Sequence, residues 1–191
     1  MADRPGQEPE GNSSRLMFLL QGGIFMVLAG MVYQDFKYRG IYWWMFPILL
    51  LLMATATVQV LGFTATISQA VKSSLFLALQ FVVLTGYISI KQKKLTNIFD
   101  GFFGLGDLLF LVVLCFGLSF LNYVLFYLLS LMLIILFTAI FGYQSTAHGK
   151  KIPLAGYQAL LLMILMAAGW YMPYINLLAD DHLLNLLGYG N

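Results

Sequence analysis

Six apolar runs occupy most of the chain and limit what it can fold into. They cover residues 16–33, 41–61, 73–90, 105–121, 123–141 and 154–172. Each approaches the length of about 20 apolar residues that an α-helix needs to cross a bilayer. Only 9% of the 191 residues are charged, whereas about a quarter are charged in soluble domains. We therefore expect an all-α fold, a polytopic membrane bundle of about six transmembrane helices.

The residues around these runs divide the chain into three parts. Residues 1–14 are polar and rich in proline and glycine, which predicts a disordered tail. Residues 15–173 form the membrane-embedded domain, whose first run lacks the pattern of a cleaved secretory signal. Residues 174–191 place leucines around an Asp-Asp-His sequence at 180–182. This tail fits either an interfacial amphipathic helix or a terminal cap that packs on the bundle.

Basic residues are concentrated in alternate connections between the runs. Residues 34–40, 91–104 and 142–153 hold seven of the ten lysines and arginines, whereas Lys72 lies in a connection of the opposite set. Cytoplasmic loops carry such an excess, so we expect both termini outside the cytoplasm and a multi-pass protein of the plasma (inner) membrane. The three lysines within 91–104 suit anionic lipid headgroups, and nothing in the sequence indicates nucleic-acid binding.

Eight carboxylates reduce to three candidates for chemistry. Five lie in the two polar tails, which leaves Asp35, Asp100 and Asp107. Ionisable residues at membrane depth are costly and favour a functional role. Asp35 follows the first run and Asp107 opens the fourth, at the same expected depth, which suggests a pair. Asp100 is the alternative partner, a solvated loop residue, or a contact to a basic substrate segment.

The surroundings of Asp107 favour catalysis. Asp107 ends the string Gly104-Leu105-Gly106-Asp107, in which glycines permit tight turns and the close approach of another chain. Two carboxylates that lie close together share one proton, since both cannot ionise cheaply. The ionised member can take a proton from water while the protonated member donates to the scissile carbonyl. This predicts an aspartic-protease pair that requires no metal or cofactor.

These motifs resemble those of the type IV prepilin peptidases and their archaeal preflagellin relatives. The likeness includes Asp35 followed by alternating basic residues, the Gly-x-Gly-Asp string, and an Ile-Pro stretch at 152–153, and it spans residues 16–172. It implies an endopeptidase that cleaves the leader of pilin-like precursors at the cytoplasmic face, with Asp35 and Asp107 as the catalytic pair. The expected substrate contacts are Gly104, Gly106, Lys37, Arg39 and Asp100.

The sequence also departs from that family. The family has Ile-Pro-Asn after its first aspartate, where this chain has Ile41-Tyr42-Trp43, and a lysine two residues after the second, where this chain has Leu109. The cysteine-rich domain that accompanies N-methylation in longer bacterial members is missing, since Cys115 is the sole cysteine. We therefore expect a peptidase without methylation activity.

Two other functions stay open at this point. One is a presenilin-like intramembrane diaspartyl protease, to which Tyr33-Gln34-Asp35 is loosely similar. The other is a non-catalytic or transport-type membrane protein descended from a peptidase, although transporters commonly show an internal repeat and none is recognisable here. The expected partners are a pilin-like precursor and membrane lipid, and homodimerisation is left open. Neither histidine has neighbours at metal-ligand spacing, so no metal is expected.

Overall fold

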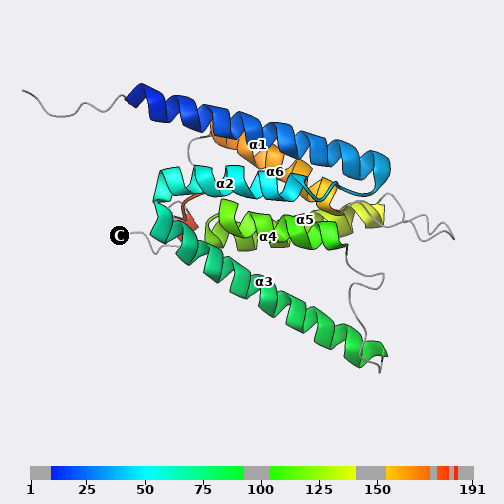
Figure 1. Cartoon of the computed structure of the whole chain (residues 1–191). Coiled ribbons are helices and arrows are strands. Elements are labelled where there is room, and N and C mark those ends of the chain that lie inside the picture. Colours follow the sequence, from blue (N-terminus) through cyan, green and yellow to red (C-terminus); the bar gives the residue numbers. More distant parts are fainter. Residues whose placement is uncertain (1–9, 93–103, 141–153, 173–175, 181–182, 185–191) are drawn as a thin grey trace, which may run out of the picture.

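The fold is a bundle of α-helices (Figure 1). A computed structural model describes residues 10–92, 104–140, 154–172, 176–180 and 183–184. Within these residues there are six helices and no strands, as the apolar runs predict. The helices are α1 (Glu10–Tyr38), α2 (Met45–Leu61), α3 (Phe63–Gln92), α4 (Leu105–Gly117), α5 (Phe120–Ile140) and α6 (Leu154–Tyr171).

Three of these helices contain segments that are long and apolar enough to cross a membrane. The segments are Ser13–Tyr38, Phe63–Lys91 and Leu154–Tyr171. Shorter apolar stretches lie in the other helices, at Met45–Leu61, Leu105–Gly117 and Phe120–Leu133. The 13 residues of α4 correspond to about 20 Å, less than the hydrocarbon thickness of about 30 Å. The structure thus supports a membrane protein, whereas six complete crossings remain a prediction.

The shortest helix, α4, lies at the centre of the bundle. It packs against α2, α3, α5 and α6, whereas α1 lies outside and contacts α2 and α6. Phe110, Leu114 and Cys115 of α4 are almost fully buried. Large apolar side chains such as Met26, Val82 and Ile90 are instead highly exposed. Such an exposed apolar surface suits contact with lipid.

Two glycines let α2 pack closely against its neighbours. A Cβ atom on Gly30 of α1 would lie 2.8 Å from the Met45 Cε atom, and one on Gly117 of α4 would lie 2.7 Å from the Met53 Cε atom. Met45 and Met53 are both buried. Small residues are common where membrane helices approach closely, and the flexible thioether fills the remaining space.

The start of α1 differs from the prediction. Residues 10–14 were expected in the disordered tail, but α1 begins at Glu10, so this part of the prediction was wrong. The physical reason is that the last proline of the polar segment is Pro9, and a proline directly before a helix does not interrupt it. Residues 1–9 lie outside the described residues.

The start of α2 is also later than the apolar run suggests. Residues 42–44 form a turn in which Met45 N donates to Tyr42 O at 3.1 Å. The helix then begins at Met45, which puts Pro47 in its first turn. A proline is tolerated there because the first backbone N–H groups have no partner within the helix.

The expected connection around Lys72 is replaced by one residue, Gly62. Gly62 has a φ of 80°, and α3 begins directly after it. The polar residues at 64–69 lower the hydropathy without interrupting the helix. Thr66 Oγ1, for example, donates to Gly62 O at 2.9 Å, so its hydroxyl is satisfied within the helix. Lys72 therefore lies on α3.

The C-terminal segment packs as a cap on α5. The break between α4 and α5 falls at Leu118 and Ser119 rather than near residue 122. Ser119 N donates to Leu177 O at 3.0 Å, and Leu121 N donates to Asp180 Oδ1 at 3.2 Å. A carboxylate is favourable at a helix N-terminus. Residues 176–180 thus have the packing expected of a terminal cap.

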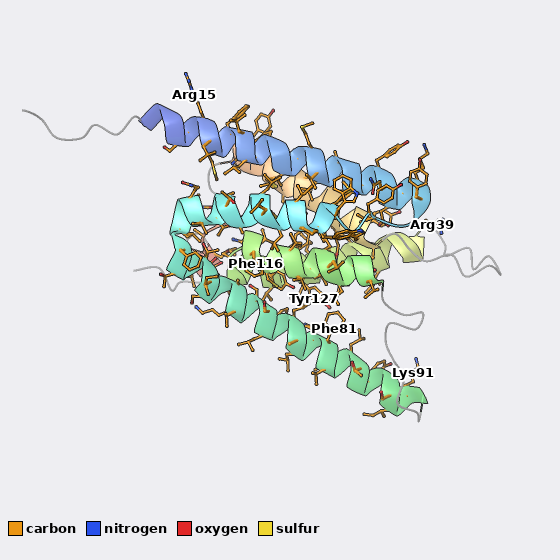
Figure 2. The ribbon with its side chains drawn as sticks, in the orientation of Figure 1. Arg15, Arg39, Phe81, Lys91, Phe116 and Tyr127 are labelled. Atoms are coloured by element: carbon orange, nitrogen blue, oxygen red, sulfur yellow. The ribbon has the colours of Figure 1, made fainter. Side chains whose placement is uncertain are left out.

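Basic residues lie at both ends of the bundle. Figure 2 places Arg39 and Lys91 at one end and Arg15 at the other. Figure 1 shows that α1 begins, and α6 ends, at the same end as Arg15. Trp170 Nε1 near the end of α6 accordingly donates to Gln21 Oε1 in the first half of α1, at 3.2 Å.

Candidate functional site

Asp35 lies in the last turns of α1 and is buried, with 6% of its surface exposed. Its Oδ2 atom accepts a hydrogen bond of 2.6 Å from Gly156 N. The next residue, Phe36, makes an edge contact with Tyr157, with ring centroids 4.9 Å apart. Asp35 is therefore held against the beginning of α6 by a polar and an aromatic contact.

Asp107 lies in the first turn of α4 and is half-buried. Its Oδ2 atom accepts a hydrogen bond of 3.2 Å from Gly104 N. This is the bond that an acidic residue makes to the residue before its own helix in a capping box. Its Oδ1 atom accepts a bond of 2.8 Å from Ala155 N. One carboxylate thus joins the start of α4 to the start of α6.

The two aspartates converge on consecutive backbone amides. Ala155 and Gly156 belong to the first turn of α6, where backbone N–H groups have no partner within the helix. The N-terminal end of the helix also carries partial positive charge, which favours carboxylates. Both side chains therefore lie against one helical turn, although α1 and α4 do not pack extensively against each other.

Glycines leave the space that these carboxylates occupy. A Cβ atom on Gly156 would lie 2.9 Å from Asp35 Oδ2 and 3.1 Å from Asp35 Cβ. A Cβ atom on Gly104 would lie 2.7 Å from Asp107 Oδ2. At Gly106 the nearest atom would be Phe46 Cζ at 3.7 Å, an ordinary contact. The close approach of a carboxylate thus explains why glycine occupies positions 104 and 156. It does not explain the glycine at position 106.

The basic residues after Asp35 occupy the end of α1. Lys37 Nζ donates to the Tyr33 hydroxyl at 2.6 Å and lies 5.0 Å from the centre of that ring. Arg39 adopts a φ of 54°, and its N–H donates to Asp35 O at 2.9 Å. Arg39 thereby terminates α1. Asp100, the remaining predicted substrate contact, lies outside the described residues.

The amides of Ala155 and Gly156 are the part of the site that sequence reasoning missed. The family likeness includes the Ile-Pro stretch at 152–153, which lies just before these residues, but it indicates no role for a backbone amide. A backbone donor has no side-chain signature, so its role is hard to recognise in a sequence. The available signal was Gly156 itself, three residues after Pro153 at the start of an apolar run.

Comparisons with family models, curated proteins and solved structures found no match to this chain. Among the residues that the structure describes, no group of three or more His, Cys, Asp or Glu side chains could hold a metal ion. Asp35 and Asp107, which both contact the first turn of α6, are therefore the candidate functional residues.

Proposed function

We propose that this protein is a membrane-embedded aspartic endopeptidase. The observation that carries the proposal is the convergence of Asp35 and Asp107 on the amides of Gly156 and Ala155. Ionisable side chains are costly inside an apolar bundle. Two aspartates from separate helices that lie close together there therefore indicate a functional site. A pair held against one helical turn is suited to acid–base chemistry.

The pair acts through one shared proton. The ionised aspartate takes a proton from a water molecule, whose oxygen attacks the carbonyl carbon of the scissile bond. The protonated aspartate donates its proton to the carbonyl oxygen, which gives a tetrahedral intermediate. Return of a proton to the amide nitrogen lets the C–N bond break. The amides of Ala155 and Gly156 keep both carboxylates oriented throughout these steps.

The proposed substrate is a pilin-like precursor, and cleavage removes its leader at the cytoplasmic face without N-methylation. The substrate class comes from the sequence likeness. The sequence supports the orientation, because seven of the ten lysines and arginines lie in residues 34–40, 91–104 and 142–153 and basic residues favour the cytoplasmic side. In this orientation the catalytic pair lies near the inner surface of the plasma membrane, within a bundle that crosses it about six times.

A purely structural role is the second candidate, and the same hydrogen bonds favour it. Each aspartate already satisfies a first-turn amide of α6, as a capping residue does. In that case the pair would join α1, α4 and α6 in a non-catalytic membrane protein. The two roles differ in what an asparagine can replace. Its side-chain oxygen still accepts from the amide, but it cannot hold or donate the catalytic proton.

The experiment follows the size of a pilin-like precursor coexpressed with wild-type protein, Asp35→Asn or Asp107→Asn. The proposal expects processing by wild type and at least a hundredfold loss in each variant, at equal membrane levels and with unchanged thermal stability. A roughly hundredfold loss is the lower range for removal of a general acid or base.

Asp180→Asn is the matched control. Asp180 also accepts a hydrogen bond from a first-turn amide, at Leu121 N, but it lies with the cap on α5. The Asp180→Asn variant should process the precursor at the wild-type rate. Full processing by Asp35→Asn and Asp107→Asn would instead support the structural role, as would a failure of the wild type to process any precursor.

A further inference from the structure

A cavity of about 330 Å³ lies in the half of the bundle away from the aspartates. It is bounded by the first half of α1, the second half of α2, the C-terminal ends of α4 and α6, and residues 176–178. Neither Asp35 nor Asp107 lines it. The cavity is therefore separate from the proposed catalytic pair.

The lining of the cavity changes in character along the helix axes. Its deep part is formed by Ile24, Met53 and Leu162, all of which are buried. Its shallow part includes Gln21 and Trp170, which share a hydrogen bond of 3.2 Å. Trp170 is half exposed and lies next to the last residue of α6. The cavity is thus apolar in its deep part, and its polar groups are those of Gln21, Trp170 and Asn176.

The lining excludes two classes of ligand. No lining residue is charged, so the cavity has no partner for a metal ion or an ionic substrate.

A ligand that fills this cavity gains dispersion contacts with the atoms that line it. In a bilayer the abundant molecules with a narrow apolar part and a polar end are lipids. Along α1 the lining extends from Met17 to Ile24, a rise of about 10 Å. This length accommodates part of an extended hydrocarbon chain.

We propose that this cavity binds one acyl chain of a membrane lipid. The chain contacts Ile24, Met53 and Leu162 along its length. The polar end of the lipid lies towards Gln21 and Trp170, where tryptophan commonly marks the headgroup level. This proposal is independent of the proposed peptidase activity.

The test compares wild type with Gly169→Leu, which adds a side chain at a position that lines the cavity. The purified full-length proteins are delipidated in detergent and incubated with palmitoyl-oleoyl-phosphatidylethanolamine or, in a separate arm, with oleic acid. Native mass spectrometry then counts bound molecules, and thermal unfolding is measured with and without each probe. A ligand that binds only the folded state stabilises it, by an amount that rises with the logarithm of the ligand concentration above Kd.

The expected result is one bound molecule and a rise in Tm for wild type, with both lost in Gly169→Leu. The variant should also unfold at a higher temperature than wild type when neither probe is present. A response to the phospholipid alone assigns the chain to a bilayer lipid, and a response to oleic acid alone assigns it to a free fatty acid. Either result supports an acyl-chain site.

Gly22→Leu is the matched control, because it makes the same change on an exposed face of α1 where an added Cβ meets no atom within 4 Å. It should bind like wild type. Met166→Phe, a second change in the lining, should also reduce binding and keeps the test valid if Gly169→Leu fails to fold. Equal binding by wild type and a folded cavity variant would overturn the proposal, as would an absence of binding in wild type.

Discussion

Gly156 is the residue at which the candidate site leaves least room for change. An added methyl group would lie 2.9 Å from Asp35 Oδ2 and 3.1 Å from Asp35 Cβ, so Gly156→Ala must displace Asp35 or the start of α6. Overpacking of this kind costs about 1–3 kcal/mol. We expect the processing rate of the precursor to fall by about tenfold or more, since a tenfold change corresponds to about 1.4 kcal/mol.

Gly22→Ala provides the comparison for this prediction, because the same substitution meets nothing within 4 Å. It should keep the wild-type rate of processing. Membrane levels of both variants are measured on the same samples. An unchanged rate in Gly156→Ala would show that the position of Asp35 against α6 is not needed for activity.

The aspartates could be identified from the sequence because their side chains are ionisable. Their hydrogen-bond partners, the amides of Ala155 and Gly156, could not. Asp35 and Asp107 could be selected because few carboxylates lie near the apolar runs and ionisable groups at membrane depth are costly. The structure brings both to the start of α6, and their catalytic role stays a prediction. Gly156 could not be identified in the same way, since its contribution is a backbone amide and an absent side chain.

Among the helices, the turn from α2 to α3 depends on a single residue. Gly62 has a φ of 80° and a ψ of 162°, a region that is essentially limited to glycine and costs residues with a Cβ atom about 1–3 kcal/mol. Gly62→Ala should therefore lower the free energy of unfolding by about that amount. Thermal unfolding of the purified protein in detergent measures the effect as a lower Tm.

Gly86→Ala should instead raise the Tm. Gly86 lies inside α3, and an added Cβ there meets no atom within 4 Å. Alanine is favoured over glycine in a helix interior by about 0.5–1 kcal/mol. A Tm that rises or stays equal in Gly62→Ala would contradict the account of this turn.

Hydropathy was sufficient to place the helices but not their ends. Every apolar run overlaps with a helix. In an apolar environment the backbone N–H and C=O groups must pair with each other, and a helix pairs them within one segment. The start of α3 was missed because polar residues such as Thr66 interrupt the apolar pattern, while the Thr66 hydroxyl bonds to the backbone of its own helix. The start of α5 depends on residues 176–180, which are distant in sequence.

At the scale of the whole molecule, the proposed orientation can be measured with cysteine labelling. Wild-type protein provides a low background because its one cysteine, Cys115, is buried. Ser14→Cys near the start of α1 should react with a membrane-impermeant maleimide in intact cells. Gly40→Cys, in the connection from α1 to α2, should react only after permeabilisation, because Arg39 next to it favours the cytoplasmic side.

Both positions are exposed, so the difference in labelling reports the membrane and not burial within the protein. A Cβ atom added at Gly40 meets no atom within 4 Å, so the substitution displaces no neighbouring group. Labelling of Gly40→Cys but not Ser14→Cys in intact cells would place the aspartates at the outer surface and contradict cleavage on the cytoplasmic side.

The pairing of Met45 with Gly30 and of Met53 with Gly117 makes the contacts of α2 sensitive to oxidants. Conversion of a thioether to a sulfoxide adds a polar oxygen at these close contacts. Met45 is buried and does not line the cavity, so peroxide reaches its sulfur only when α2 separates from α1, whereas Met53 lines the cavity. The oxidation rate of Met45 relative to that of Met53 therefore reports how often these two helices separate.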